Sequence, residues 1–259
     1  MVNRRVISNL GVYVYAAGAT ALGVSGLVWR DFATNWQRVG PDVPYREALA
    51  IFVALYEIAA GVAIAWPRTR RAGAAMLTVL YAIFTLLWVA QAVRVPRVYD
   101  GWGNVFEELS LTIAGMVAYA WASPQDSVWA RRRAWISRGY GICPISFGVD
   151  HFVYLSGAAT FVPKWIPPGG MFWVVTTAVC FLLAAAAILS GILAGLAARL
   201  LTAMIAGFEI LIWLPRFVGA PHMHFMWAAN SVSLALVGAA WVVADGIVES
   251  GQSPIGISQ

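Results

Sequence analysis

The sequence predicts an all-α integral membrane protein, with eight transmembrane helices arranged as two parallel four-helix bundles. Three observations predict this fold class. The 259 residues are 61% hydrophobic and only 11% charged, whereas a soluble domain carries about 25% charged residues. Apolar stretches of roughly the 20 residues that a helix needs to cross the hydrocarbon recur between short charged loops. The two halves of the sequence also resemble each other.

Each predicted span is an apolar stretch bounded by charged, proline or glycine residues. We expect spans near residues 7–29, 46–66, 72–94, 104–122, 138–157, 171–190, 195–214 and 224–244. Residues 30–45 are too polar to span, so we expect them to lie along the membrane interface, with Trp29 and Trp36 at the depth of the lipid headgroups. Residues 1–21 also fit the pattern of a signal peptide, and we expect them to be retained within the first span.

An internal duplication is predicted by three matching segments that occur in the same order in both halves. The pairs are 22–29 (LGVSGLVW) with 147–154 (FGVDHFVY), 95–97 (VPR) with 214–216 (LPR), and 109–115 (LSLTIAG) with 232–238 (VSLALVG). Four helices per repeat is an even number, so both repeats enter the membrane from the same side and should be parallel. We therefore divide the chain into a first repeat (1–122), a charged connector (123–137), a second repeat (138–245) and a polar tail (246–259).

Arginine residues set the predicted orientation. Of the seventeen basic residues, only Lys164 is a lysine, and the two densest clusters lie at 68–71 and 131–133. In an eight-span arrangement both clusters share the side of the N-terminus. Cytoplasmic loops carry an excess of basic residues, so we expect a multi-pass protein of the cell membrane with both termini cytoplasmic. We interpret the isoelectric point near 9.5 as contact with the headgroups of the lipid bilayer, and not as a nucleic-acid surface.

Glu57 is the clearest candidate for a functional side chain because it lies midway along the second predicted span. Ionisable groups inside a membrane are costly and usually face the interior of the bundle. A carboxylate there must be protonated, paired, or hydrogen-bonded to a partner such as Tyr56 or an arginine at the end of the third span. Two interpretations stay open: a buried polar clamp between helices, or a carboxylate that handles protons or binds a headgroup.

Further acids lie near arginines in both halves. Glu107 and Glu108 open the fourth predicted span, close to Arg97, and Glu209 lies late in the seventh, close to Arg216. The first turn of a helix also favours acids through the helix dipole. We favour structural acid–arginine pairs in both repeats, with a polar pocket that receives a ligand as the alternative.

The three histidines fall on the same predicted side of the membrane. His151 follows Asp150 in the fifth predicted span, and His222 and His224 precede the eighth. Histidines with a nearby acid can bind zinc and similar metals, but nothing in the sequence brings the fifth span to that loop. We therefore favour interfacial hydrogen bonding and predict no metal site.

Other sequence features narrow the chemistry. The chain has no Walker loop, no GxGxxG after a strand, no HExxH and no CxxCH, so no motif supports ATP hydrolysis, dinucleotide binding, zincin chemistry or c-type haem. Cys143 and Cys180 form no CxxC pair and are expected to be buried small side chains. Thirteen tryptophans and nine tyrosines indicate an aromatic belt, and a flat lipid-soluble ring such as a quinone could stack on some of them.

One stretch of the first half resembles the DoxX/DoxD-like membrane protein family. Residues 57–61 (EIAAG), followed by 66–75 (WPRTRRAGAA), are similar to the family's helix with Glu-x-x-x-Gly, arginine-bearing turn and small-residue helix. Residues 148–152 (GVDHF) and 162–167 (VPKWIP), with Phe172 and Trp173, are similar to DoxX-like proteins that contain Val-Pro-x-Trp-Ile-Pro.

The resemblance implies a fused pair of four-helix units that works with redox partners. Family members are linked to thiosulfate:quinone oxidoreductase and to complexes that handle thiol and superoxide stress. The second half departs from the pattern, because Leu182 and Leu183 are apolar where the first half has Glu57. The resemblance therefore carries over only Glu57 and the arginines of its turn.

The leading hypothesis is a membrane subunit that supports a quinone- or thiol-linked redox process, with protein partners or as a homo-oligomer. The alternatives are a transporter or lipid-binding protein, and a structural subunit of a larger membrane complex. The sequence assigns no catalytic residue and does not decide whether the chain is an enzyme. Quinone is the one cofactor class that it suggests.

Overall fold

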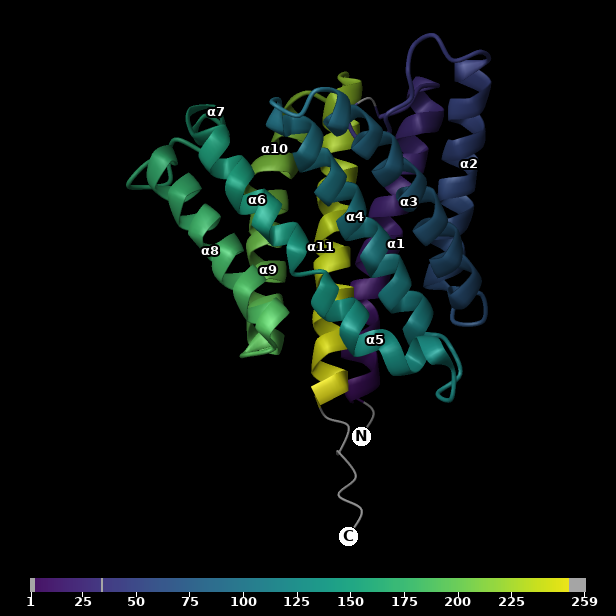
Figure 1. Cartoon of the computed structure of the whole chain (residues 1–259). Coiled ribbons are helices and arrows are strands. Elements are labelled where there is room, and N and C mark those ends of the chain that lie inside the picture. The colour runs from purple at the N-terminus through teal and green to yellow at the C-terminus, as the bar shows by residue number, and fades with distance from the viewer. Residues whose placement is uncertain (1–2, 34, 252–259) are drawn as a thin grey trace.

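The computed structural model describes residues 3–33 and 35–251, and this part of the chain is helical with no strand (Figure 1). The first half holds α1 (Asn3–Trp29), α2 (Arg46–Ala65), α3 (Arg70–Arg94) and α4 (Tyr99–Trp121). The connecting helix is α5 (Val128–Gly139). The second half holds α6 (Ile142–Val153), α7 (Leu155–Ala159), α8 (Gly170–Ser190), α9 (Ala194–Phe208), the π-helix η1 (Glu209–Trp213), α10 (Leu214–Gly219) and α11 (His224–Gly251).

Six helical stretches among the described residues are long and apolar enough to cross a membrane. They are Leu10–Trp29, Arg46–Ala65, Arg70–Arg94, Gly170–Ser190, Ala194–Gly219 and His224–Val248. They coincide with the predicted first, second, third, sixth, seventh and eighth spans, and they indicate a helical, multi-pass membrane protein. The other two predicted spans correspond to α4, which carries three acids, and to the short helices α6 and α7.

The predicted fifth span, residues 138–157, is not a continuous helix. Its first residues belong to the end of α5, and the remainder forms α6 and α7. Pro144 lies in the first turn of α6, where its missing N–H leaves no helical hydrogen bond unmade. Tyr154, with φ −107° and ψ 30°, then separates α6 from α7. The hydrophobicity of this stretch therefore predicted burial correctly for its first part, since α7 has no buried residue, and it did not predict the interruption of the helix.

The predicted seventh span continues beyond its expected end at residue 214. The helix widens at η1, where the N–H of Leu214 bonds to the carbonyl of Glu209, and then runs on as α10 to Gly219. A proline ring inside a helix collides with the carbonyl four residues before it, and one wide turn relieves the collision. Pro215 is thus accommodated inside the helix, so the prediction that the seventh span ends at residue 214 is wrong.

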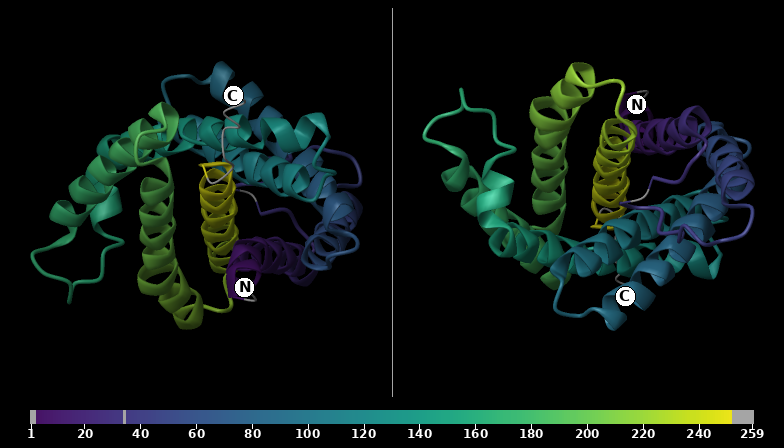
Figure 2. Two further views of the ribbon diagram at one scale, coloured as in Figure 1. Left: turned by 90° about the horizontal axis from the view of Figure 1, so that it is seen from below. Right: turned by 90° about the horizontal axis from the view of Figure 1, so that it is seen from above.

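The connection between α1 and α2 enters the bundle. We call its described residues, 30–33 and 35–45, the inserted loop. Phe32, Ala33, Trp36 and Gln37 are all buried, and Figure 2 shows the loop running inward between the ends of the helices. The prediction that this segment lies along the membrane interface is therefore wrong for these four residues, because their side chains find partners inside the protein.

The first and last helices join the two halves. α11 packs along α1 and also contacts α4, α5 and α9, and it lies at the centre of the molecule (Figure 1). A Cβ on Gly18 would lie 2.3 Å from the backbone nitrogen of Ala235, and one on Gly238 would lie 2.1 Å from that of Tyr15. The two helix backbones therefore touch, as small residues permit in membrane helix pairs.

The two halves also share details of packing. A Cβ on Gly23 of α1 would meet the carbonyl oxygen of Ala54 and the side chain of Ile58 in α2, at 2.7 and 2.8 Å. A Cβ on Gly148 of α6 would meet the carbonyl oxygen of Ala178 and the side chain of Leu182 in α8, at 3.0 and 2.9 Å. Gly23 and Gly148 belong to the paired segments found in the sequence. The same contact therefore recurs in each half between corresponding helices.

Most of the predicted charged connector is helical. α5 begins after Ser127, whose hydroxyl accepts a hydrogen bond from the N–H of Ala130 at 3.1 Å. It lies across the end of the molecule at which the first and last helices have their free ends (Figure 1). Three consecutive arginines, 131–133, accompany Trp135, which is 73% exposed. Such a composition suits a helix that lies in the membrane interface.

Candidate functional site

A cavity of about 500 Å³ lies between α4, α6, α8, α9, η1 and α11. Aromatic rings form much of its wall: Phe147, Phe161, Trp173, Phe181, Phe208, Trp213 and Phe225. The inserted loop adds Asn35 and Trp36, so residues of both halves line the cavity. Its size and apolar wall, with a few polar groups, are typical of a small-molecule site.

One end of the cavity is acidic because α4 and α6 pack closely there. The hydroxyl of Tyr99 lies 3.0 Å from that of Ser146, and the N–H of Asp100 donates to the hydroxyl of Tyr154 at 3.0 Å. Gly103 keeps the helices close, since a Cβ at this position would lie 3.4 Å from Oδ1 of Asp150. The structure thus brings together carboxylates from two helices that are separate in sequence.

His151 lines the same cavity in a fixed orientation. Its Nδ1 lies 2.8 Å from the carbonyl oxygen of Phe147. Its ring packs edge-on against Phe181, at 5.3 Å between centroids, and is stacked on Phe208 at 6.1 Å. A carbonyl can only accept, so Nδ1 carries the hydrogen in this contact, and Nε2 of the neutral ring is an acceptor.

Glu107 lines the cavity and is held by the inserted loop. Its Oε2 accepts a hydrogen bond from Nε1 of Trp36 at 2.7 Å. Trp36 is fixed in turn by its carbonyl, which accepts from Nε1 of Trp88, and by stacking on Phe225 at 5.7 Å between centroids. The sequence singled out Glu107, Asp150 and His151 separately, and the structure places all three at one cavity.

Glu57 belongs to a second polar cluster, inside the first half. It is completely buried. The hydroxyl of Tyr81 donates to its Oε1 at 2.8 Å, and Nε2 of Gln37 donates to its Oε2 at 3.0 Å. Tyr56 was one of the partners that the sequence suggested, but its hydroxyl donates to the carbonyl of Met76 at 3.3 Å. The neighbours of Glu57 in space are thus an α3 tyrosine and a loop amide, and neither an adjacent residue nor an arginine.

The predicted acid–arginine pairs do not form. The ion pairs within the described residues are Arg30–Glu47, Arg46–Asp31 and Arg199–Asp245, and none involves Arg97, which is exposed. Arg216 lies 4.2 Å above the ring of Phe161 and donates to the carbonyl of Thr160 at 3.5 Å.

Glu108 and Glu209 therefore lack their predicted arginine partners. Glu108 is 1% exposed, and its Oε2 has no hydrogen-bond partner. Glu209 is also buried, in the π-helix, and its Oε2 is likewise unpartnered. Helix geometry separates these acids from the arginines, because the cations lie at helix ends and the acids face inward.

The described residues contain no group of three or more histidines, cysteines and acids arranged to hold a metal ion. His224 stacks on Trp29 at 5.3 Å between centroids, while His222 is exposed. The two cysteines are free: Cys143 is buried as predicted, whereas Cys180 is exposed on α8, contrary to the prediction.

Sequence reasoning missed Trp36 and Gln37, which hold Glu107 and Glu57. The available signal was length, because an uninterrupted connection of about 12–15 residues or more is uncommon in a compact domain and is usually functional. The connection from 30 to 45 exceeds this length.

No protein-family model, no curated protein and no solved structure matches this chain. The resemblance to DoxX-like proteins therefore stays a prediction that rests on the short segments quoted above. The geometry of the cavity is the feature that bears most directly on function.

Proposed function

We propose that this protein binds a lipid-soluble aromatic molecule of the quinone class in the cavity between its halves. The observation that carries the proposal is the combination of an aromatic wall with the polar side chains of Glu107, Asp150 and His151 in the lining of one cavity. A flat ring gains contact by stacking on aromatic side chains, and the polar side chains would orient its oxygen atoms.

The polar groups favour the reduced, hydroxyl-bearing form of such a ring. Nε2 of His151 is an acceptor in the observed arrangement, and Asp150 and Glu107 carry further acceptor oxygens when ionised. A quinol has two hydroxyl groups to donate, whereas a quinone can only accept. The cavity therefore offers partners that match the quinol better.

We assign binding of the ring to this chain, and its oxidation or reduction to a redox partner, as the DoxX-like resemblance implies. Protein partners in a membrane complex thus form part of the proposal.

The proposal includes eight spans in two parallel repeats, with α4 and the α6–α7 segment as the remaining two. α4 has 23 residues and packs along α3, and the glycine contacts recur between α1–α2 and α6–α8. Both termini are placed in the cytoplasm because the arginine-rich turn after α2 and the arginines of α5 lie at one end of the molecule (Figure 1).

A direct binding measurement tests the function. The full chain would be reconstituted in lipid nanodiscs and titrated with a soluble short-chain quinol, following tryptophan fluorescence. We expect saturable binding that His151→Phe weakens at least tenfold. Phe152→Leu is the matched control, because Phe152 is the next residue of α6 and is 45% exposed. Absence of saturable binding by the wild-type protein, or equal affinity in both variants, would overturn the proposal.

A proton-coupled transporter is the second candidate, and buried Glu108 favours it. Its unpartnered Oε2 lies inside the first half, where another buried carboxylate, Glu57, is held by two hydrogen bonds. A carboxyl group that changes partners could carry a proton through this region. Proton flux into proteoliposomes that disappears in Glu108→Gln would favour this function over quinol binding alone.

A further inference from the structure

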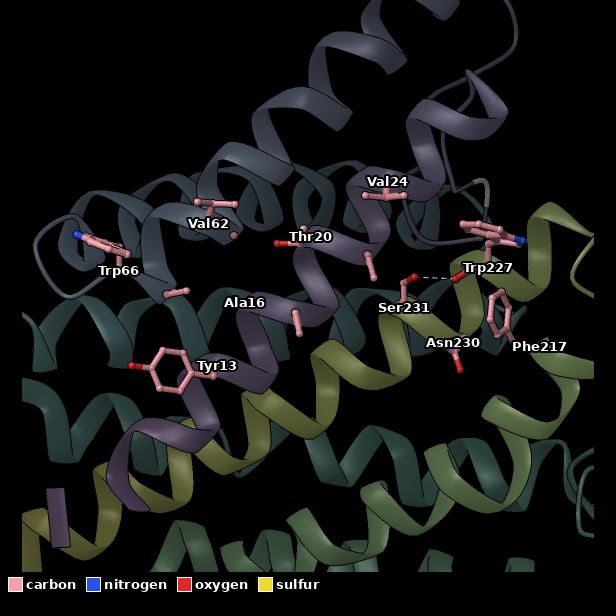
Figure 3. A pocket seen from close by; sticks show the side chains of 14 residues that line it. Tyr13, Ala16, Thr20, Val24, Val62, Trp66, Phe217, Trp227, Asn230 and Ser231 are labelled. Atoms are coloured by element: carbon pink, nitrogen blue, oxygen red, sulfur yellow. Dashed lines mark hydrogen bonds between the residues drawn. The ribbon is translucent and has the colours of Figure 1, made fainter. Parts of the chain in front are cut away.

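A second recess lies on the outer surface of the first half, away from the cavity between the halves. It is a groove of about 740 Å³ that runs over α1 between α2 and α11 (Figure 3). Small residues of α1, among them Ala16, Ala17 and Thr20, form its floor, and Val62 and Trp227 stand at its sides. We propose that this groove holds an acyl chain of one anionic phospholipid, whose phosphate binds at the arginine-rich turn between α2 and α3.

The groove has the length of one membrane leaflet. Its α1 lining runs from Tyr13 to Val24, which is about 16 Å at roughly 1.5 Å per residue. The hydrocarbon core of a bilayer is about 30 Å thick, so one leaflet supplies about 15 Å. The neighbouring residue Gly23 contacts Ala54 near the middle of α2. The groove thus extends from the end of α2 past its middle to the first turns of α11, where Trp227 lines it.

The groove opens toward the lipid and is mainly apolar. Val62 is 58% exposed and Ala17 is also exposed. Gly61 lets α2 approach the floor, since a Cβ there would lie 2.3 Å from Oγ1 of Thr20. Ser231, one of the few polar residues of the lining, donates its hydroxyl hydrogen to the carbonyl of Trp227 at 2.8 Å. The lining therefore suits a hydrocarbon chain that enters from the bilayer.

Positive charge gathers at the end of the groove near the turn between α2 and α3. Tyr13 and Trp66 mark this end in Figure 3, and the following turn contains Arg68, Arg70 and Arg71 without an acid between 66 and 75. The Arg70 guanidinium lies 5.9 Å from the ring of Tyr13. At the opposite side Arg30 and Arg46 pair with Glu47 and Asp31, and Arg216 lies over the ring of Phe161.

Arg68 is exposed and can reach the headgroup layer. Phe217 and Trp227 close the opposite end with aromatic rings. A lipid with its phosphate at the arginines and its chain along α1 would match the basic end and the apolar remainder of the groove. Anionic lipids are attracted to such basic segments.

Native mass spectrometry of the full chain, released from nanodiscs of phosphatidylglycerol or phosphatidylcholine, tests the proposal. We expect one phosphatidylglycerol to remain bound to the wild-type protein and phosphatidylcholine to be retained at least tenfold less. Ala17→Trp fills the groove and should reduce retention of phosphatidylglycerol tenfold. Ala186→Trp is the control, because Ala186 is an exposed alanine of α8 outside the groove.

Arg68→Gln should reduce the preference for phosphatidylglycerol while the protein remains folded, as judged by circular dichroism. Equal retention of both lipids by the wild type, or equal retention by Ala17→Trp and Ala186→Trp, would overturn the proposal. If Ala17→Trp instead dissociates a dimer without loss of lipid, the groove is an interface between two copies and the lipid proposal is wrong. None of these results depends on quinol binding.

Discussion

The two halves of this protein use similar helices but treat their longest connections in opposite ways. In the first half, the inserted loop enters the bundle, and its buried Gln37 bonds to Glu57. In the second half, the connection between α7 and α8 projects outward (Figure 2), and Trp165 near its tip is 73% exposed. The inserted loop therefore occupies space inside the first half, whereas the connection between α7 and α8 contributes only Phe161 and Val162 to the wall of the cavity.

The difference extends to the residue that corresponds to Glu57. Ala54 and Ile58 in α2 make the same glycine contacts as Ala178 and Leu182 in α8. By this correspondence the position equivalent to Glu57 is Phe181, and not the Leu182–Leu183 pair suggested by the sequence. Phe181 lines the cavity and packs against His151. Glu57 lies where the inserted loop supplies a hydrogen-bond donor, whereas Phe181 lies at the equivalent position beside the open cavity.

The largest expected loss of stability comes from disrupting the close contact between α1 and α11. In Gly238→Val, the new side chain would collide with the backbone of Tyr15, because even a Cβ would lie 2.1 Å from its nitrogen. We expect a loss of at least about 3 kcal/mol in the free energy of unfolding, or no folded protein. Gly207→Val is the control, because nothing lies within 4 Å of a Cβ there. Unfolding in detergent by sodium dodecyl sulfate measures both, and equal stability would disprove the close contact.

A somewhat smaller effect is expected from removing the carboxylate of Glu57. Glu57→Leu leaves the Tyr81 hydroxyl and the Gln37 amide buried without their acceptor. We expect a loss of about 2–4 kcal/mol in the free energy of unfolding. Glu57→Gln retains a carbonyl acceptor and should lose less than half as much. The same unfolding titration compares the two, and equal losses would show that the hydrogen bonds are unimportant.

The contrast between an inserted and an excluded loop is tested by one alanine substitution in each. Gln37→Ala removes a buried hydrogen bond and should cost about 1–2 kcal/mol of unfolding free energy. Trp165→Ala should change it by less than about 0.5 kcal/mol, because the side chain is mostly exposed. Thermal unfolding in nanodiscs distinguishes the two. A larger cost at Trp165 would reverse the comparison.

Among the substitutions of buried residues, the smallest loss of stability is expected at Trp36, together with a measurable change in binding. Trp36→Phe keeps a ring at the cavity wall but removes the Nε1 donor to Glu107. We expect about 1 kcal/mol of destabilisation and a several-fold change in affinity for a short-chain quinol. Isothermal titration with Trp165→Phe as control measures the change. An unchanged affinity would show that the inserted loop does not influence binding in the cavity.

Helix positions were largely predictable because apolar stretches end at charged or glycine residues. The predicted spans 46–66, 72–94 and 171–190 lie within two residues of α2, α3 and α8 at each end. The fifth span and the inserted loop were not predictable from periodicity, since tertiary contacts decide them. Asp31 and Arg38 make the loop polar, whereas Phe32 and Trp36 bury it.

The candidate site was predictable in its acids but not in their arrangement. Their positions in or at the ends of predicted spans made Glu57, Glu107 and Asp150 conspicuous, because charged residues are rare inside a membrane. Their partners come from distant parts of the chain: Trp36 is 71 positions from Glu107. A pattern of neighbouring residues cannot reveal such contacts, so the sequence suggested arginines that the fold keeps at the helix ends.

Trp36 and Gln37 are consecutive residues, and each holds an acid of a different cluster. The two hydrogen bonds are therefore mechanically linked through one peptide unit. An occupant of the cavity that displaces the Trp36 ring would pull on the Gln37 amide and alter the surroundings of Glu57. Because the link is short, we expect the inserted loop to transmit a change at the cavity to the buried cluster, so that the surroundings of Glu107 and Glu57 change together.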